Sequence, residues 1–179
     1  MQRISHKADV LVFRGKRFAV LKRIIDVNGN EIIRDVVSFG VAVAVLPIIN
    51  DSKVVLVKQY RAPVNSWILE VPAGKVELGE SPEECARREL EEETGYRAMR
   101  IEKLVSIYTS PGYSDEVLHI YLAKELVYVG AKPERYELLK VVVLPIDEAI
   151  KSILSAPIVD AKTLLALLFY TSLYHSSVK

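Results

Sequence analysis

A short segment of the chain concentrates acidic side chains at a spacing that could hold a metal ion. The stretch RRELEEETG, residues 87–95, places two arginines and four glutamates in seven consecutive positions. Such a segment is often only the solvated face of a helix. Like charges at this spacing repel one another, however, and carboxylate oxygens are the ligands that Mg²⁺ prefers. The segment is therefore a candidate metal site as well as a candidate surface helix.

The flanking residues predict a helix over residues 82–94. Ser81 is a suitable N-cap, Pro82 suits the first helical position, and Glu84 can complete a capping box with Ser81. Gly95 is a natural stop at the carboxyl end. The sequence therefore fixes both ends of the helix.

The helical geometry sorts the side chains of this segment into faces. Because each residue advances by about 100°, Glu89, Glu92 and Glu93 share one arc of the helix. The other positions follow from the same rotation: Ala86, Leu90 and Thr94 can face the core, whereas Glu84, Arg87 and Glu91 point to solvent. Three carboxylates on one arc favour a bound divalent cation over a purely solvated face.

The spacing of residues 74–96 resembles the signature of a known family. Five residues separate Gly74 from Glu80, seven more precede Arg88-Glu89-Leu90, and Glu92-Glu93, Gly95 and Tyr96 complete the run. This is the Nudix box, G-x5-E-x7-R-E-U-x-E-E-x-G-U with U apolar or aromatic, and every fixed position matches. Gly74 and Gly79 would let the loop fold closely over the start of the helix. The chain therefore resembles a Nudix hydrolase.

The resemblance implies hydrolysis of a nucleoside diphosphate linked to another group, with Mg²⁺ as the expected cofactor and Mn²⁺ as the alternative. It implies that the metal ligands are Glu89, Glu93, the backbone carbonyl of Ala73 and Glu92, which is either a ligand or a holder of water, with Glu80 supporting them from behind. Arg88 lies one turn from Glu92 and can hold it through a charge-assisted hydrogen bond. The metal would neutralise the pyrophosphate and activate water.

Residues outside the box resemble the ADP-ribose pyrophosphatase subgroup. The segment TSPGYSDE, residues 109–116, places Pro111 sixteen residues after Gly95 and Gly112 directly after it. The segments VKQYR, WILEVPAGKVELGES and PIDEAI…DAKTLLAL are also similar. An ordinary turn is the other interpretation of Pro111-Gly112. The resemblance implies ADP-ribose as substrate, AMP and ribose 5-phosphate as products, and Pro111 and Gly112 as substrate-binding residues.

Three further residues are candidates for substrate binding. Arg61 ends VKQYR and would reach the pyrophosphate, since a guanidinium fork suits phosphate oxygens. Arg34 is a second candidate, and the resemblance implies that it could be provided across a homodimer, because the subgroup builds its sites from two subunits. Glu70 lines the site or is an inward structural carboxylate. Each arginine could instead be a surface charge.

The general base is predicted to be Glu137, which lies in GAKPERYELLK just ahead of the strand leading to Pro145. Glu134, in the same segment, and Glu92 are the alternatives, because this segment is more basic than the family pattern. The adenine partner stays open among Trp67, Tyr60, Tyr108 and Tyr113. The three histidines are scattered and predict no zinc site.

The rest of the chain is predicted to form a sheet and two more helices. These elements must hold the box residues in place. Predicted strands are 8–14, 17–27, 31–39, 41–49, 53–61, 66–74, 101–108, 116–123 and 138–144; predicted helices are 145–154 and 160–175. Asn28-Gly29 predicts a tight hairpin, and the apolar run 41–49 predicts a strand covered on both faces. We expect an α+β Nudix fold, an α/β/α sandwich with a mixed β-sheet between helices. Residues 1–40 would be an N-terminal antiparallel β extension used for dimerisation, and residues 41–179 the hydrolase domain.

Composition limits the protein's class. The chain has 179 residues, a formal net charge of +1 and one cysteine, Cys85. The balanced charge gives no general attraction to nucleic acid or membranes, and one cysteine excludes an internal disulfide and fits a reducing compartment. No apolar run can span a bilayer and no secretory signal is visible. We expect a cytoplasmic enzyme whose partner is a small nucleoside diphosphate sugar.

Other functions stay open at this point. A Nudix pyrophosphatase could act on a different nucleotide sugar, such as GDP-mannose, or on a damaged nucleotide. A Nudix domain that senses ADP-ribose without cleaving it is a second alternative, which the intact box disfavours. RNA decapping would require a basic channel, and the net charge of +1 gives that reading little support.

Overall fold

The computed structural model describes residues 3–131 and 138–175. The chain divides into two compact units. One unit, here called the N-terminal unit, comprises Met1–Val41 and Ile107–Leu118, and the other, here called the box unit, comprises Ala42–Ser106 and His119–Lys179. None of the helices in the described part of the chain has the length and apolar composition needed to cross a membrane.

The N-terminal unit is built on a three-stranded antiparallel sheet in the order β1-β2-β3. Its strands are β1 (Ile4–Arg14), β2 (Ala19–Val27) and β3 (Asn30–Ser38). The predicted Asn-Gly hairpin joins β2 to β3, with φ angles of 56° at Asn28 and 88° at Gly29. The pairing of β1 with β2 shifts register twice, between His6 and Ala8 and between Leu11 and Phe13. No residue of these three strands is buried.

The box unit is built on a seven-stranded mixed sheet. Its strands are β4 (Val41–Ile49), β5 (Lys53–Arg61), β6 (Ser66–Glu70), β7 (Ala73–Lys75), β8 (Tyr96–Tyr108), β9 (Val117–Tyr128) and β10 (Leu139–Pro145). The main order is β10-β5-β4-β9-β8, while β6 pairs with β5 and β7 pairs with β4. Residues 42–48 of β4 are all buried, so the predicted coverage of this strand on both faces is confirmed.

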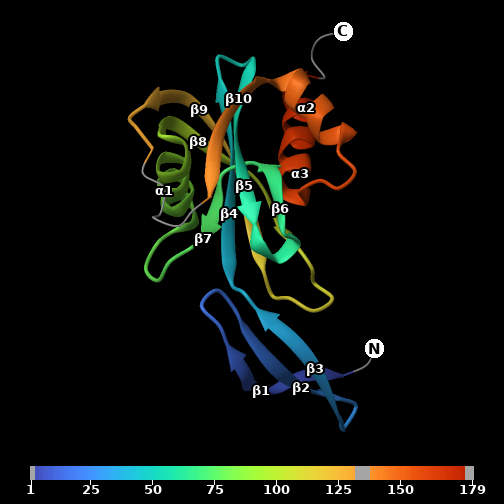
Figure 1. The fold of residues 1–179 in the computed structure, drawn as a ribbon. Helices are drawn as coiled ribbons and strands as arrows, with labels where there is room; N and C mark the ends of the chain where they lie inside the picture. Colours follow the sequence, from blue (N-terminus) through green and yellow to red (C-terminus); the bar gives the residue numbers. More distant parts are fainter. Residues whose placement is uncertain (1–2, 132–137, 176–179) are drawn as a thin grey trace. The chain divides into compact units, whose positions relative to one another are not determined.

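Helices cover the two faces of this sheet. Helix α1 (Pro82–Thr94) lies on one side, and α2 (Ile146–Ser155) and α3 (Ala161–Tyr170) lie together on the other (Figure 1). This arrangement is the predicted α/β/α sandwich. The last predicted helix is shorter than expected, because one π-helical turn, Thr171–His175, follows α3.

The inner face of α1 forms part of the core. Ala86, Leu90 and Thr94 are buried, as the helical geometry predicts. Leu90 packs with Val43 of β4 and Tyr121 of β9 in one apolar cluster. Burying a side chain such as Leu90 contributes about 1.5–3 kcal/mol to folding, and this contact fixes which way the opposite, acidic arc of α1 faces.

The predicted single strand over residues 66–74 is wrong. The chain forms two strands there, because β6 pairs with β5 and β7 pairs with β4. The change of partner occurs at Val71-Pro72, where the Pro72 carbonyl accepts a hydrogen bond from the Val45 N–H at 2.9 Å. Proline has no N–H to donate to a ladder, so this is a natural place for one pairing to end.

Candidate active site

The capping residues of α1 hold its acidic face in register. The Ser81 hydroxyl accepts from the Glu84 N–H at 3.3 Å, and the Glu84 carboxylate accepts from the Ser81 N–H at 2.8 Å. At the other end Gly95 has a φ of 76°, and its N–H donates to the Glu91 carbonyl at 2.9 Å. The predicted helix is confirmed at both ends.

Two of the predicted metal ligands lie against β7. A Cβ atom on Gly74 would be 1.9 Å from Oε1 of Glu89, so the Glu89 carboxylate occupies the space that any other residue would fill. The Ala73 N–H donates to Oε2 of Glu93 at 3.3 Å, and Glu93 is only 2% exposed. Two consecutive turns of α1 thus bring Glu89 and Glu93 together with the backbone of Ala73-Gly74.

Arg88 ties the remaining acidic residues to this group. Its Nε and Nη2 donate to the two oxygens of Glu80 at 2.8 and 3.0 Å. Its Nη1 donates to Oε1 of Glu89 at 2.8 Å and to Oε2 of Glu92 at 3.2 Å. The expected contact from Arg88 to Glu92 is therefore present, and Glu80 supports Arg88 from the other side.

These ion pairs shift the titration of the groups involved. The hydrogen bond from Arg88 is the main cause that lowers the pKa of Glu80 to about 2. The same contact, with the charge of Glu89, raises the pKa of Arg88. The side chain of Glu92 is 42% exposed, against 15% for Glu89, so Glu92 is the carboxylate of this group with the most room to move.

The donor atoms suit a hard divalent cation. Glu89 and Glu93 supply carboxylate oxygens beside a peptide backbone, which is the ligand chemistry of Mg²⁺ and Mn²⁺. Within residues 3–131 and 138–175, no three His, Cys, Asp or Glu side chains are already grouped closely enough to hold a metal. Glu92 would have to turn from Arg88 to add a third carboxylate, and its exposure allows that movement.

A second charged group lies at the ends of β5 and β6. Nε and Nη2 of Arg61 donate to the two oxygens of Glu70, each at 2.8 Å. Glu70 is 1% exposed, which fits the second interpretation of this residue, an inward structural carboxylate. The hydrogen bonds that Arg61 donates to Glu70 are the main cause that raises the pKa of Arg61, and the charge of Glu93 adds to the effect. The charge of one box carboxylate, Glu93, therefore acts on Arg61.

Lys162 and Asp160 also belong to this charged group, and the sequence analysis predicted no role for either of them. The ammonium group of Lys162 donates to Glu70 and, at 2.9 Å, to Asp160. Asp160 stands before an apolar helical run, so its N-cap position is visible in the sequence. No local pattern shows that Lys162 meets a carboxylate 92 residues earlier in the chain.

Three predicted substrate-binding residues belong to the N-terminal unit. Arg34 lies in β3 and is exposed, and its Nη1 donates to the Ile33 carbonyl at 3.0 Å. Pro111 and Gly112 lie in the loop between β8 and β9. Their roles stay predictions. Glu137 and Glu134 lie outside the described residues.

The carboxylate of Asp115 fixes the loop that carries Pro111 and Gly112. It accepts hydrogen bonds from the Ser38 hydroxyl at 2.9 Å and from the N–H groups of Phe39 and Gly40 at 2.7 and 3.2 Å. Burial opposes the charged form, but these hydrogen bonds outweigh it and lower the pKa of Asp115. The Asp115 carboxylate therefore ties the loop to the end of β3, and the sequence analysis did not predict this contact.

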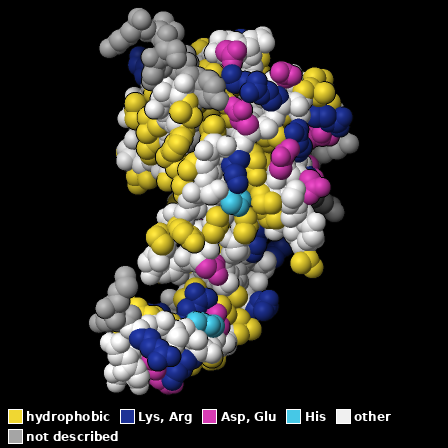
Figure 2. Space-filling model, turned by 180° about the vertical axis from the view of Figure 1, so that it is seen from behind, with side chains coloured by type: hydrophobic (Ala, Val, Ile, Leu, Met, Phe, Trp, Pro, Cys, Tyr) yellow, Lys and Arg dark blue, Asp and Glu magenta, His cyan; other side chains and the backbone are white. Residues whose placement is uncertain are grey.

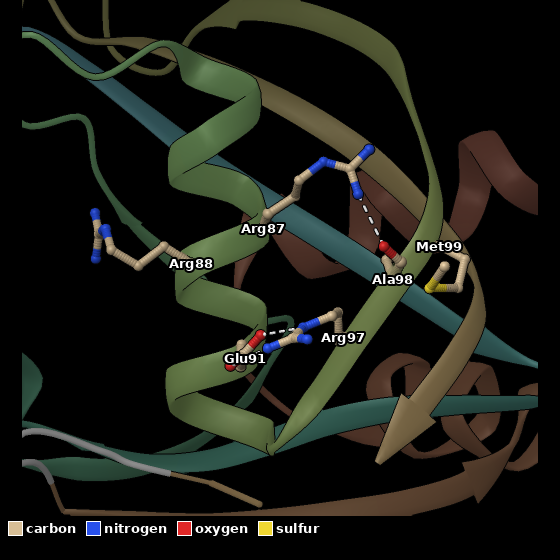
Figure 3. A pocket seen from close by; sticks show the side chains of 6 residues that line it. All are labelled: Arg87, Arg88, Glu91, Arg97, Ala98 and Met99. Carbon is tan, nitrogen blue, oxygen red and sulfur yellow. Dashed lines mark hydrogen bonds and ion pairs between the residues drawn. The ribbon is translucent and has the colours of Figure 1, made fainter. Parts of the chain in front are cut away.

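A hollow of about 350 Å³ lies between the outer side of α1 and β8. Its lining residues are Arg87, Arg88, Glu91, Arg97, Ala98 and Met99 (Figure 3). Arg87 donates to the Ala98 carbonyl and Arg97 donates to Glu91, each at 2.8 Å. Arg88 points away from the other five side chains (Figure 3), toward the acidic group described above. The hollow therefore lies behind the candidate site.

Comparison with known proteins places these features in context. The sequence matches the protein family described as NUDIX domain over residues 38–167. An ADP-ribose pyrophosphatase of Bacillus subtilis is 44% identical over 142 residues, which cover 78% of this chain and 77% of that protein. A methanol dehydrogenase activator of Bacillus methanolicus is 45% identical over 141 residues, covering 78% and 76%.

More distant similarity extends to another activity and to a solved structure. A GDP-mannose pyrophosphatase of Yersinia enterocolitica is 36% identical over 160 residues, which cover 80% of this chain and 81% of that protein. The crystal structure of an ADP compounds hydrolase matches with a TM-score of 0.84, covering 99% of this chain and 97% of that one. At 24% sequence identity this last likeness shows the fold.

Proposed function

This chain belongs to the Nudix hydrolase family, and from that premise we propose that it cleaves the pyrophosphate bond of ADP-ribose to give AMP and ribose 5-phosphate. The observation that carries the proposal is that Glu89 and Glu93 of the intact box lie against the backbone of Ala73-Gly74. Only glycine at position 74 leaves room for the Glu89 carboxylate. The 44% identity to an ADP-ribose pyrophosphatase supports the choice of substrate.

The residues of the site divide the chemical work. Glu89, Glu93 and the Ala73 carbonyl would hold a divalent metal, with Glu92 joining them; we propose Mg²⁺, with Mn²⁺ as the alternative. When bound, the metal neutralises the pyrophosphate and lowers the pKa of a water molecule. Arg88 keeps Glu80 and its neighbours aligned.

Substrate binding would use further residues of the chain. We propose that the guanidinium of Arg61, held by Glu70, binds the pyrophosphate. Its Nη1 makes no hydrogen bond to any residue that the structure describes, so this donor can turn to a phosphate oxygen. Arg34, Pro111 and Gly112 are proposed to contact the rest of the substrate.

The general base is proposed to be Glu137, with Glu134 and Glu92 as alternatives. Glutamine replaces a carboxylate with a neutral group of nearly the same shape, so Glu137→Gln, Glu134→Gln and Glu92→Gln can be compared directly. The variant that loses turnover while its metal affinity stays at the wild-type value identifies the base. An undiminished kcat in Glu137→Gln removes that residue from the mechanism.

A substrate panel tests the proposed reaction. Hydrolysis of ADP-ribose, GDP-mannose and a nucleoside triphosphate is measured side by side with and without Mg²⁺, and the products of the preferred substrate are identified. We expect the highest kcat/KM for ADP-ribose, and AMP and ribose 5-phosphate as products. Preference for GDP-mannose would point to the activity named for the Yersinia relative, and binding without turnover would point to a sensor.

We also propose a homodimer that uses the strands β1–β3 and works in the cytoplasm. The N-terminal unit leaves many large apolar side chains exposed: Ile4, Val10, Leu11, Val12, Phe13, Phe18 and Ile33. Figure 2 shows hydrophobic side chains among the charged ones on the visible face. Exposed apolar groups concentrated on one small sheet are typical of an interaction surface.

The oligomeric state is tested by light scattering. We expect a dimer for the wild type, and a monomer when a charge is placed on this sheet in Leu11→Glu or Val12→Glu, two exposed positions of β1. Lys16→Glu changes a charge in the exposed turn of the same unit and serves as the control. A monomeric wild type at micromolar concentration would contradict the proposal.

A further inference from the structure

A buried carboxylate in the box unit is shared between two cations from different elements. Glu70 ends β6 and is 1% exposed. Its two oxygens accept from Arg61 at 2.8 Å each, and the ammonium group of Lys162 in α3 donates to one of the same oxygens. Burying a charge is costly unless it is paired. Arg61 alone would satisfy this requirement with its two-bond fork, so the second cation calls for an explanation.

The first turn of α3 holds Lys162 in place. One oxygen of Asp160 accepts from Lys162 at 2.9 Å. The other oxygen accepts from the Thr163 N–H at 2.9 Å and from the Thr163 hydroxyl at 2.6 Å, so Asp160 caps the helix. The amide dipoles at the start of α3 offset part of the Asp160 charge. Lys162 is therefore held between two carboxylates, Asp160 of its own helical turn and Glu70 of β6.

The same turn of α3 also holds the neighbouring backbone. The N–H of Val71, the residue after Glu70, donates to the hydroxyl of Thr163 at 2.8 Å. Thr163 is fully buried. Val71 lies where the chain leaves β6 and turns into β7, and β7 carries the Ala73-Gly74 backbone. Two consecutive residues beside the candidate site are thus tied to α3.

We propose that Lys162 is a positioning residue for substrate binding, acting through Glu70 on Arg61. This inference rests on the function proposed above. Two cations share the Glu70 carboxylate, so Arg61 neutralises only part of its negative charge and keeps more of its own positive charge for the pyrophosphate. Without Lys162, the whole negative charge of Glu70 falls on Arg61 and the attraction for phosphate oxygens weakens. The fixed Glu70 carboxylate also holds the Arg61 fork in one orientation, which lowers the entropy lost when it binds substrate.

A purely structural role for Lys162 is the competing explanation. Buried ion pairs contribute little net stability compared with apolar residues of the same size. In Lys162→Met the Glu70 carboxylate still has Arg61 as its partner, so no buried charge is left unpaired. We therefore expect the variant to fold, and its effect to fall on substrate binding.

Binding without turnover gives the most direct test. The Kd for ADP-ribose is measured by calorimetry in EDTA, where no divalent metal is available for hydrolysis. We expect Lys162→Met to raise Kd about tenfold, which corresponds to about 1.4 kcal/mol. Lys162→Arg keeps the positive charge and should stay within about threefold of the wild type. With metal present, KM should rise more than kcat falls.

A matched lysine provides the control. Lys124 pairs with Asp51 at 2.6 Å and lies 5.7 Å from the centre of the Tyr170 ring, at the other end of α3. Lys124→Met removes an ion pair of the same unit whose Asp51 partner is exposed, and we expect its Kd and KM to match the wild type. Thermal unfolding of each variant is followed in parallel, and Lys162→Gln replaces Lys162→Met in all measurements if the latter does not fold.

A double-mutant cycle with Arg61→Ala separates positioning from structure. If Lys162 acts through Arg61, Lys162→Met should change Kd by less than about twofold once Arg61 is absent. The same tenfold loss in both backgrounds would overturn the inference, and so would an unchanged Kd in Lys162→Met alone. If the wild type cleaves another nucleotide sugar and not ADP-ribose, the proposed substrate is wrong, and the cycle is run with the nucleotide sugar that it cleaves.

Discussion

Strand β4 of the box unit and strand β1 of the N-terminal unit both belong to hydrogen-bonded sheets, but their side chains are buried to opposite extents. Seven consecutive residues of β4 are buried, whereas all eleven residues of β1 are exposed. Backbone pairing therefore specifies both sheets, but nearly all the buried apolar side chains of the described residues belong to the box unit. A three-stranded sheet needs an apolar face packed against something to be stable, which is why we expect a second copy to cover the N-terminal sheet.

Thiol reactivity should give the largest difference between the two units. Cys85 lies on the buried face of α1, and burial raises the pKa of its thiol to about 12. Because the thiolate is the reactive form, alkylation of Cys85 in the native protein should be roughly 10³-fold slower than that of an exposed thiol. Reaction with a maleimide, followed by mass, measures this rate.

An engineered thiol extends the comparison to β1. In Val12→Cys with Cys85→Ala, the new thiol should react rapidly at concentrations where the protein is monomeric and slowly where the proposed dimer forms. Equal rates at both concentrations would show that nothing covers this face of β1. Rapid labelling of native Cys85 would show that the core of the box unit is looser than its burial indicates.

Glu93→Gln should abolish catalysis while leaving both units folded. A ligand that contacts the metal should matter more than the supporting residues, whose loss costs about 10–100-fold, so we expect kcat to fall by more than about 100-fold. Metal affinity by calorimetry should fall in parallel. Glu91→Gln, on the solvent side of the same helix where Glu91 pairs with Arg97, is the control and should keep wild-type activity.

Gly74→Ala should have a smaller effect through the same site. The added Cβ would lie 1.9 Å from Glu89, so either β7 or the Glu89 side chain must move. We expect kcat/KM to fall by about 10–100-fold, as for loss of a residue that supports a metal ligand. Dimer mass should not change, because the affected contact lies within the box unit. Unaltered kcat/KM would mean that the position of Glu89 against β7 is unimportant.

The smallest effect concerns the dependence of stability on pH. Arg88 lowers the pKa of Glu80 from 4.5 to about 2. A lowered folded-state pKa gives stability that is fully present above pH 4.5 and is lost as the pH falls toward 2. The free energy of unfolding of the wild type should therefore exceed that of Glu80→Gln by roughly 1–3 kcal/mol at pH 7, and the difference should shrink below pH 4.5.

A matched pair in the N-terminal unit sharpens this measurement. Arg23 lowers the pKa of Asp9 to about 2, but the Asp9 side chain is 29% exposed, against 15% for Glu80. Solvent screens such a pair strongly, so Asp9→Asn should change the denaturation midpoint less than Glu80→Gln does. Urea titrations at pH 7 and pH 3 test both variants. An equal or larger effect for Asp9→Asn would contradict this ranking of the two pairs.

Local signals in the sequence were sufficient to predict the ends of α1 and the positions of the box residues on it. Ser81, Glu84 and Gly95 act on neighbouring backbone groups, so they fix the helix ends without help from the rest of the fold. The spacing of the glutamates then follows from helix geometry alone. The Asn28-Gly29 hairpin was predictable for the same reason.

Features that depend on distant partners were not predictable in this way. The split of residues 66–74 into β6 and β7 follows from pairing with two different strands. The contacts from Lys162 to Glu70 and from Asp115 to Phe39 join residues 92 and 76 positions apart. No periodicity within a short segment encodes such contacts, and they are the ones that orient Arg61 and the loop around Pro111.

The two shifts in register along β1 have a consequence for solubility. An exposed strand at the border of a sheet offers unpaired amide groups to any passing chain, and apolar side chains make such a border prone to form fibrils. Each bulge interrupts the regular spacing of those groups and twists the strand. Strand β1 is bulged beside His6 and again beside Leu11. The irregular backbone of β1 can thus pair with one complementary strand, but it opposes the repeated strand pairing that builds a fibril.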